Sequence, residues 1–246
     1  MMGWPEGTAR VVLEETDSTQ TQAFARSDDA PVWVLAHRQT SGTGRRGRPW
    51  QMPTGNFAAT LALRPKDAVH RRSLRSFTAA LALRDALSEL TGQPALFSLK
   101  WPNDVLCRGR KLAGILLESR GDVLLIGIGI NLAAAPAHSV LEQGSTAPID
   151  LLSASGQLIG AEDMLDALAP AFAEREARLL REGFDPQQAE WMRGATRLGQ
   201  PIVARFAHHE LSGRFDGIDA DGALLLSTAE GIQRLPAAEI YFNEAG

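Results

Sequence analysis

Two apolar segments separated by a two-residue turn constrain the fold of this 246-residue chain most strongly. Leu112–Ser119 and Val123–Asn131 are typical of strands, and the turn Gly121-Asp122 between them indicates a β-hairpin. Two earlier strand-like segments, Val32–His37 and Phe57–Leu63, also follow each other with only a loop between them. This order favours a mixed sheet with helices packed on it over a regular parallel doubly wound sheet.

The remaining pattern up to residue 195 combines strands with three helices. Leucine and alanine recur at three- and four-residue steps between Leu74 and Leu90, and Gly92 is suited to end that helix. Pro170 lies inside another helical pattern, where it predicts a kink or a break. Further strands are predicted at Val11–Glu15 and Leu96–Lys100, and helices from Asp17 or Ser18 to about Arg26 and from about Glu162 to Glu182.

The pattern of predicted secondary structure changes after about Ala195. Four short strand-like segments follow, and Asp221-Gly222 is a strong hairpin signal between two of them. We therefore expect two domains, residues 1–195 and a small all-β barrel over residues 196–246, which is near the lower size limit for an independent domain. The fold class predicted from these patterns is α+β.

Composition excludes several classes of protein. Hydrophobic residues make up 44% and charged residues 22%, as in an ordinary soluble globular protein, and the net charge of −4 argues against a general nucleic-acid or membrane binder. Cys107 is the only cysteine, so an intrachain disulfide and a thiolate zinc cluster are excluded. The longest apolar stretch, Val123–Leu132, is too short to span a bilayer, and the first ten residues lack a secretory pattern. We expect a cytoplasmic protein.

The most informative stretch is the loop from Gln39 to Trp50. Gly42, Gly44 and Gly47 match the dinucleotide-binding pattern G-x-G-x-x-G, but the last glycine should then open a helix. Arg48-Pro49-Trp50 follows instead, and the residue before a proline is disfavoured in the helical region. No Gly-Lys-Ser/Thr ends the loop, so it is not a phosphate-binding Walker loop either.

This loop carries three arginines, which suit an anionic ligand. The guanidinium forks of Arg45, Arg46 and Arg48 match phosphate and carboxylate oxygens, although a solvated basic loop without a ligand would have the same sequence. Because the glycines are permissive and nothing apolar lies between Ser41 and Arg48, we expect the loop to be mobile until a ligand orders it.

Three further stretches contain candidate ligand-binding residues. Lys111 opens an apolar strand and either points into a cleft, where it could neutralise developing negative charge, or lies at an exposed strand end. Glycines precede Asn131 in Ile126–Asn131, which indicates either the close approach of a ligand or a bulged core strand. The stretch Thr16–Gln20 serves helix capping, ligand contact or both. Neither metal-ligand spacing of the histidines nor a G-x-S-x-G elbow is present.

In this order and spacing, the stretches resemble the catalytic region of bacterial biotin–protein ligases, from about Val11 to the end of the chain. The most specific elements are Gly42-Thr-Gly-Arg-Arg-Gly-Arg48 with Trp50, then Lys100-Trp-Pro-Asn-Asp104, then Lys111-Leu-Ala-Gly-Ile-Leu. The resemblance implies a domain similar to class II aminoacyl-tRNA synthetases followed by an SH3-like barrel. It also implies that biotin reacts with Mg²⁺-ATP to give biotinyl-adenylate, which then biotinylates a lysine in the carrier domain of a biotin-dependent carboxylase.

By the same resemblance, individual residues receive roles. Lys111 and Arg45 are implied to be catalytic, and Asp104 to help the incoming lysine lose its proton. No protein metal site is implied, because Mg²⁺ comes with ATP. The resemblance assigns biotin binding to Ser18, Thr19, Gln20, Gln39, Gly42, Thr43, Gly44, Arg45, Trp50, Lys111, Gly114 and Gly127, and ATP binding to Arg45, Arg46, Arg48, Trp50, Asn103 and Asn131.

Two positions depart from the family pattern, and three alternatives stand beside the main hypothesis. Gln20 replaces a common asparagine, and Thr43 replaces a usual basic residue, which removes one charge from the loop. A repressor role is not expected, because the ligase-like region begins near residue 11 and leaves no room for a DNA-binding domain of on the order of fifty residues. A lipoate or octanoate transferase of similar fold is disfavoured by Lys100–Asp104, and an inactive biotin-binding module by Lys111 and the arginine loop.

Overall fold

A seven-stranded mixed sheet forms the larger part of the molecule. The computed structural model describes residues 3–28, 30–136, 146–206, 209–236 and 238–241. The strand order is β1-β2-β3-β7-β6-β5-β4, in which β1 and β2 are parallel and all other neighbours are antiparallel. The strands are β1 (Ala9–Thr16), β2 (Val32–Gln39), β3 (Phe57–Leu63), β4 (Phe97–Lys100), β5 (Asp104–Cys107), β6 (Arg110–Arg120) and β7 (Val123–Ile130).

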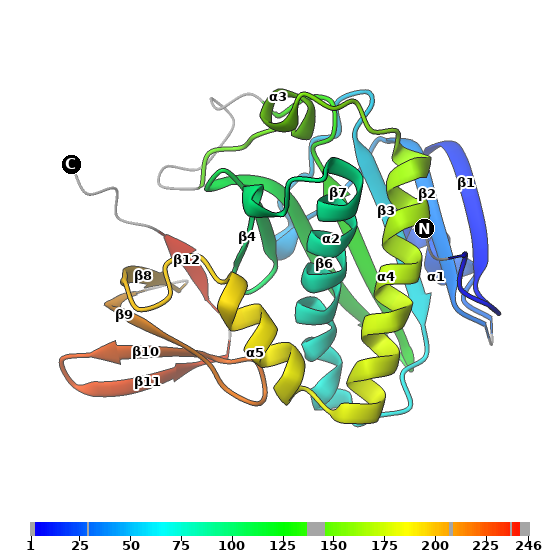
Figure 1. Cartoon of the computed structure of the whole chain (residues 1–246). Coiled ribbons are helices and arrows are strands. Elements are labelled where there is room, and N and C mark those ends of the chain that lie inside the picture. The colour runs from blue at the N-terminus through cyan, green and yellow to red at the C-terminus, as the bar shows by residue number, and fades with distance from the viewer. Residues whose placement is uncertain (1–2, 29, 137–145, 207–208, 237, 242–246) are drawn as a thin grey trace.

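The pleat of the central strands divides their side chains between two faces. In β2, Trp33 and Leu35 belong to the main core, whereas Val32 and Val34 belong to a smaller cluster that includes Ala23 of the first helix. This alternation follows from the two-residue period of a strand. The main core lies under α2 (Arg75–Thr91) and α4 (Ala161–Glu182), which pass over one face of the sheet, while α1 (Thr19–Ala25) packs on β2, β3 and β7 at the other (Figure 1).

The long helices follow the sequence pattern with one difference. Helix α2 ends at Gly92, whose left-handed φ of 66° suits a glycine. Helix α4 runs through Pro170 without the break considered from the sequence, because Leu168, Ala169 and Phe172 are buried against the core and outweigh one lost hydrogen bond. Shorter elements are α3 (Leu151–Ser155), α5 (Asp185–Gly194) and the 3-10 turns Arg45–Gly47, Val69–Leu74 and Pro94–Leu96.

A smaller antiparallel sheet follows α5, at the lower left of Figure 1. Its order is β11-β10-β9-β8-β12, so the last strand lies beside the first. The indole nitrogen of Trp101, in the larger unit, donates to the Gly222 carbonyl at 2.9 Å, and Gln188 of α5 donates to the Ile218 carbonyl. The strands are β8 (Pro201–Arg205), β9 (Glu210–Ile218), β10 (Leu224–Thr228), β11 (Gly231–Leu235) and β12 (Glu239–Tyr241).

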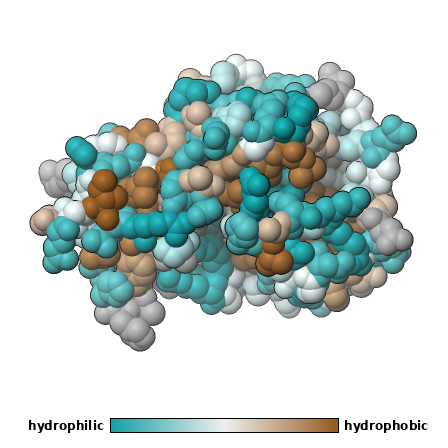
Figure 2. Space-filling model, turned by 90° about the horizontal axis from the view of Figure 1, so that it is seen from below, coloured by the Kyte–Doolittle hydropathy of each residue, from teal (hydrophilic) through white to brown (hydrophobic). Residues whose placement is uncertain are grey.

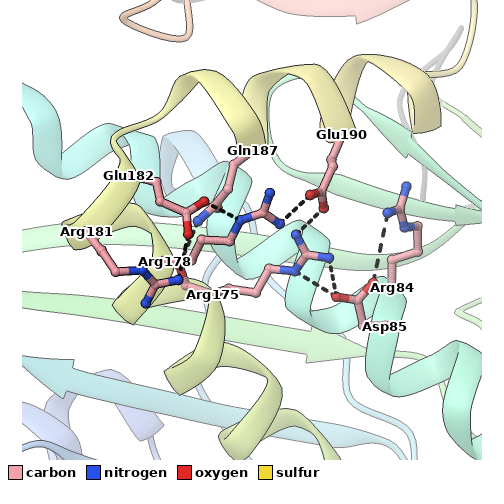
Figure 3. A network of polar contacts seen from close by, with 8 residues as sticks. All are labelled: Arg84, Asp85, Arg175, Arg178, Arg181, Glu182, Gln187 and Glu190. Carbon is pink, nitrogen blue, oxygen red and sulfur yellow. Dashed lines mark hydrogen bonds and ion pairs between the residues drawn. The ribbon is translucent and has the colours of Figure 1, made fainter.

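Helix α5 is tied to α2 and α4 by a network of charged side chains (Figure 3). Glu190 of α5 accepts hydrogen bonds from Arg175 and Arg178 of α4, and Arg175 also pairs with Asp85 of α2 at 2.6 Å. Burial works to raise the pKa of Glu190, but the two arginines outweigh it, so its pKa is lowered below the ordinary value. The network therefore holds the helix that precedes the small sheet.

The structure confirms the mixed sheet and the β6–β7 hairpin, in which Arg120 is paired with Val123. The sequence did not suggest β5, α3, α5 or β12. The residues Pro102-Asn103-Asp104 are typical of a turn by their sequence, but the turn covers residues 101–103 and Asp104 begins β5. Figure 2 shows one face as a patchwork of hydrophilic and hydrophobic side chains. Within the described ranges, none of the helices has the length and apolar character needed to cross a membrane.

Candidate active site

A cavity of about 420 Å³ lies on the α1 side of the large sheet, where its strands meet the small sheet. The central strands β3, β6 and β7 form its floor. The start of α1, the loop after β2 and strand β12 form its walls. One cavity therefore collects residues from nearly the whole length of the chain, and its walls come from both sheets.

The floor is built from residues with small side chains. Ala58, Gly129 and Gly114 are cross-strand neighbours, and Thr60 and Gly127 form a second row beside them. Strand β7 pairs with both of its neighbours without a shift in register, so its glycines do not mark a bulge. They instead make room for side chains above the sheet, as glycines in strands often do. A Cβ on Gly129 would lie 2.4 Å from the Trp50 ring, and one on Gly127 would lie 2.7 Å from Gln20 Nε2.

The arginine-rich loop folds back on itself above this floor. The Gly42 carbonyl accepts from the Trp50 amide at 2.8 Å, and the Arg48 carbonyl accepts from the Gly44 amide at 2.7 Å. These bonds place the Trp50 indole over Gly129 and Gly114. Gly42 has no space for a side chain, because a Cβ would lie 2.2 Å from Gln39 Nε2.

Lys111 and Asp104 face each other across the end of strands β5 and β6. Lys111 Nζ lies 2.8 Å from Asp104 Oδ1, and both residues line the cavity. Gly114, opposite Asp104 in the register, leaves the space that this pair occupies. Lys111 therefore points into the cavity, which decides against the exposed strand end that the sequence left open.

Lys100 is a second lysine of the cavity wall. It is buried, with 8% of its surface exposed, and its Nζ donates to the Thr146 hydroxyl at 2.8 Å. Burial lowers the pKa of Lys100 to about 8, although the nearby carboxylate of Asp104 opposes that shift. Together with Lys111 and Arg45, it gives this end of the cavity a strongly positive character.

The opposite end of the cavity carries neutral polar groups. The Gln39 side-chain oxygen accepts from the Thr19 amide at 2.8 Å and from the Thr19 hydroxyl at 3.0 Å, which orients the rest of the Gln39 amide. Ser18 is the N-cap residue of α1, but its side chain makes no capping hydrogen bond. The Ser18 hydroxyl therefore lines the cavity without being used for the helix end.

Several buried polar atoms of the cavity lack a partner within the described part of the chain. They are Gln20 Oε1, Trp50 Nε1 and Asn131 Oδ1, all from cavity-lining residues. Asn131 is 2% exposed, and its Nδ2 donates to the Ile149 carbonyl. Leaving such groups unpaired in a buried site costs about 1–3 kcal/mol each, so the arrangement indicates a polar ligand.

The small sheet contributes an acidic residue to the same wall. Glu239 of β12 pairs with Arg48 at 2.8 Å and with Arg46 at 3.4 Å, and it accepts from the Tyr241 hydroxyl at 2.9 Å. Within the described residues, the Arg45 side chain donates two long hydrogen bonds, at 3.5 Å to the Asn103 side chain and to the Ala238 carbonyl. Its burial lowers the pKa of Arg45, while Asp104 and Glu239 oppose that shift.

Most residues singled out from the sequence meet in this cavity. Arg46 and Gly42 do not line it, because Arg46 is directed to Glu239 and Gly42 supports the loop. Sequence reasoning missed Lys100, Gly129, Glu239 and Tyr241 as cavity residues, and the run Gly127-Ile-Gly129 was the one signal that could have found Gly129. The predicted residues in the wall are Ser18, Thr19, Gln20, Gln39, Thr43, Gly44, Arg45, Arg48, Trp50, Asn103, Asp104, Lys111, Gly114, Gly127 and Asn131.

The carboxylates of the cavity are already engaged by cations. Asp104 is paired with Lys111 and Glu239 with Arg48. Over the described ranges, no group of three or more histidine, cysteine or acidic side chains is arranged to hold a metal ion, and His138 and His208 lie outside those ranges. The donor set therefore fits an anionic ligand better than a bare metal ion.

Comparison with known proteins adds an independent line of support. The model of the biotin/lipoate A/B protein ligase family matches residues 12–133, and that of the biotin protein ligase C-terminal domain matches residues 198–243. The chain is 47% identical to a biotin--[acetyl-CoA-carboxylase] ligase of Paracoccus denitrificans, over 94% of this chain and 100% of the relative. It is 30% identical to the bifunctional ligase/repressor BirA of Bacillus subtilis, over 93% and 71%. A biotin protein ligase structure from Aquifex aeolicus, in complex with biotin and ATP, superposes with a TM-score of 0.80 and 27% identity, covering 94% of this chain and 97% of that one.

Proposed function

This chain belongs to the biotin protein ligase family, and we propose that the cavity described above binds biotin and ATP side by side. The protein is an ATP-dependent biotin–protein ligase. A carboxylate oxygen of biotin attacks the α-phosphorus of ATP, and the bond to the bridging oxygen of pyrophosphate breaks. A lysine amine of the acceptor protein then attacks the acyl carbon of biotinyl-adenylate, forming an amide and releasing AMP.

The neutral end of the cavity suits the ureido ring of biotin. Ser18, Gln20 and Gln39 offer a hydroxyl and two amides there, and Gln20 Oε1 is buried without a partner in the described chain. Thr19 holds the Gln39 amide in place, and Gly127 lets the ligand approach the sheet closely. Gln20 keeps both a donor and an acceptor at the position where the family commonly has asparagine, so recognition of a ureido group is retained.

The positive end suits the reacting carboxylate and phosphate. Lys111 and Arg45 line it, and cations placed where negative charge develops stabilise a transition state. Gly114 provides the space for Lys111, while the backbone of Gly42, Thr43 and Gly44 forms the cover above it. Because that cover uses backbone groups, the Thr43 side chain does not alter it.

The remaining wall suits the nucleotide. Trp50 offers an aromatic surface and an N–H, and Asn131 offers an oxygen that could accept from the adenine amino group; neither atom has a partner in the described parts of the chain. Asn103, whose side-chain amide donates to the Ile115 carbonyl at 2.6 Å, orients Arg45 beside it. We assign the phosphates to Arg45 with support from Arg48, and Mg²⁺ to the incoming ATP, because the cavity carboxylates are paired.

We further propose that the acceptor lysine lies in a biotin carboxyl carrier domain and that the reaction takes place in the cytoplasm. The curated relative is named for acetyl-CoA carboxylase, which supports this acceptor. Asp104 lies 2.8 Å from Lys111 at the reacting end. Its carboxylate could accept the proton of the incoming ammonium once Lys111 has turned to the adenylate.

The observation that carries the proposal is that one cavity over a glycine floor is lined by cations and by buried polar atoms that have no partner among the described residues. The test is intact-mass spectrometry of a biotin carboxyl carrier domain incubated with the protein, biotin and Mg²⁺-ATP. One biotinyl group should be added, together with release of pyrophosphate. Transfer of lipoate or octanoate with no transfer of biotin would contradict the proposal, and binding of biotin without any transfer would identify a binding module.

A further inference from the structure

Glu239 connects the small sheet to the arginine loop of the cavity. It lies at the start of β12, and its side chain is 12% exposed. Arg48 approaches it with both terminal nitrogens, at 2.8 Å to Oε1 and 2.9 Å to Oε2, in the bidentate geometry that makes arginine–carboxylate pairs strong. Arg46 contacts Oε2 at 3.4 Å, and the Tyr241 hydroxyl donates to the same oxygen at 2.9 Å.

These contacts keep Glu239 ionised. Partial burial works to raise the pKa of this carboxyl, but the hydrogen bonds from Arg48 and Tyr241 and the charges of Arg48 and Arg46 outweigh it. The pKa of Glu239 is therefore lowered below its ordinary value. A carboxylate with this set of donors gains little from leaving them, because an uncompensated buried charge is costly.

The three arginines of the loop consequently differ in their surroundings. Arg46 and Arg48 each pair with Glu239, whereas no ion pair with a carboxylate within 4 Å is recorded for Arg45 in the described parts of the chain. Arg45 lines the cavity, and toward the described residues its side chain donates two hydrogen bonds of 3.5 Å. Among the described residues, Arg45 is thus the loop arginine whose charge is least compensated by a carboxylate.

We propose that Glu239 is a positioning residue for the adenylation reaction: it clamps the loop of residues 41–50 over the cavity through Arg48 and Arg46, and so presents Arg45 to the ligand's phosphate. This inference rests on the proposed function for the identity of the ligand, but not for the clamp itself.

The clamp limits, without removing, the mobility that the sequence predicts for this loop in the absence of ligand. Fixing a flexible residue costs about 1–2 kcal/mol, and the part of the loop that the clamp already restrains does not draw that cost from the binding energy of the nucleotide. Exchange of Glu239 for the phosphates is the less favourable alternative, since it would leave an unpaired carboxylate beside an anionic ligand. The small sheet thus acts on the reaction through the loop.

The first test uses the ligand-free protein. Trypsin is added to the wild type, Glu239→Gln and Glu230→Gln, and peptides ending at Arg45 and Arg46 are quantified by mass spectrometry. Glu230 is the matched control because it lies, exposed, in the β10–β11 turn of the same sheet. When cleavage is slow, its rate follows the population of the open loop. We expect Glu239→Gln to increase the rate at these bonds about tenfold, and Glu230→Gln to leave it unchanged.

A second tryptic site, remote from the loop, distinguishes a local effect on the loop from destabilisation of the whole protein. Cleavage after the exposed Lys66 should be equally fast in all three proteins. Equal acceleration at Lys66 and at the loop, or unchanged cleavage of the loop in Glu239→Gln, would overturn the clamp. Because no ligand is added, this result stands whether or not the protein proves to transfer biotin.

The second test asks whether Glu239 acts on the reaction by positioning the loop or only by stabilising the fold. In pyrophosphate release, Glu239→Gln should raise the KM for ATP about tenfold, with kcat within about threefold and the Kd for biotin unchanged. In an Arg48→Gln background, the same substitution should change the KM for ATP by less than about twofold, because the bidentate partner is already absent and Arg46 contributes only a 3.4 Å contact. An unchanged KM in the single variant, or an undiminished effect in the double variant, would show that Glu239 does not act through Arg48.

Discussion

Adding one methyl group at Gly129 should disable the cavity without unfolding the protein. Gly129 lies in the middle of the floor, on β7 between β3 and β6. In Gly129→Ala, the new Cβ would lie 2.4 Å from Cε2, 2.6 Å from Cζ2 and 2.7 Å from Nε1 of Trp50. The backbone at Gly129 does not have a positive φ, so alanine is accepted there without backbone strain.

The size of the effect follows from these distances. Carbon atoms in contact lie about 3.5–4.0 Å apart, so the indole has to move by more than about 1 Å. Trp50 belongs to the loop and not to the sheet, and therefore the loop moves with it, carrying Arg45 and Arg48 away from their positions. A misplacement of about 1 Å can cost about 10²-fold in rate. We expect pyrophosphate release with saturating biotin to slow by about that factor.

Two further alanine variants are matched to this one. Gly127→Ala places its Cβ 2.7 Å from Gln20 Nε2, so we expect it to raise the Kd for biotin, measured by calorimetry without ATP, more than it slows the chemical step. Gly3→Ala meets nothing within 4 Å and should resemble the wild type. Thermal unfolding of Gly129→Ala should shift by less than about 5 °C, because the loop yields before the sheet does.

A rate of pyrophosphate release within about threefold of the wild type in Gly129→Ala would refute this reasoning. It would mean that Trp50 does not lie over Gly129 when the ligands are bound, or that its position is irrelevant to the reaction. A large loss of thermal stability would also contradict the argument, since the added methyl group would then be in conflict with the core and not with the loop.

Three other predictions follow from single residues. Lys111→Ala should slow adenylation by about 10²–10³ while the protein stays folded, because one preorganised cation is lost at the reacting end; a normal burst of pyrophosphate would exclude that role. Lys100 has its pKa lowered from 10.5 to about 8, so the unfolded chain binds more protons between these pH values. The wild type should therefore gain on the order of 3 kcal/mol relative to Lys100→Met between pH 7 and pH 11 in urea titrations, and a difference independent of pH would contradict the shift. Glu190→Gln weakens the pairs with Arg175 and Arg178 and should lower the free energy of unfolding by about 1–3 kcal/mol, whereas Glu174→Gln, which forms no ion pair with the described residues, should lower it by less than about 0.5 kcal/mol.

Much of the fold could be predicted because it depends on local patterns. Phe57–Leu63 was expected as a strand with the bounds that the structure gives it, and the helix ending at Gly92 was expected from its leucine spacing and its terminal glycine. The same local reasoning failed at Asp104, because Pro102-Asn103-Asp104 indicated a turn, whereas Asp104 begins β5, which pairs with the neighbouring strand β6. The tertiary pairing overrode the local preference.

The sequence predicted which residues belong to the candidate site better than it predicted how they are arranged in space. The glycine- and arginine-rich loop, Lys111 and Asn131 were recognised because their residue types match an anionic and nucleotide ligand. Whether Lys111 points inward, and whether the β7 glycines mark a bulge, stayed undecided in the sequence. The register of β6 and β7 settles both, because it places Gly114 and Gly129 side by side and leaves Lys111 facing Asp104.

The sequence by itself determined the class of fold, the hairpin and the residue types of the site, since each depends on the periods of strands and helices or on side-chain chemistry. Only the tertiary structure decided that Glu239, some 190 positions from Arg48, would be its partner. No local pattern carries that information, because β12 lies beside β8, and the small sheet meets the loop, only after the whole chain has folded. Contacts between residues so distant in sequence depend on packing of the entire core, and the division of roles among Arg45, Arg46 and Arg48 depends on those contacts.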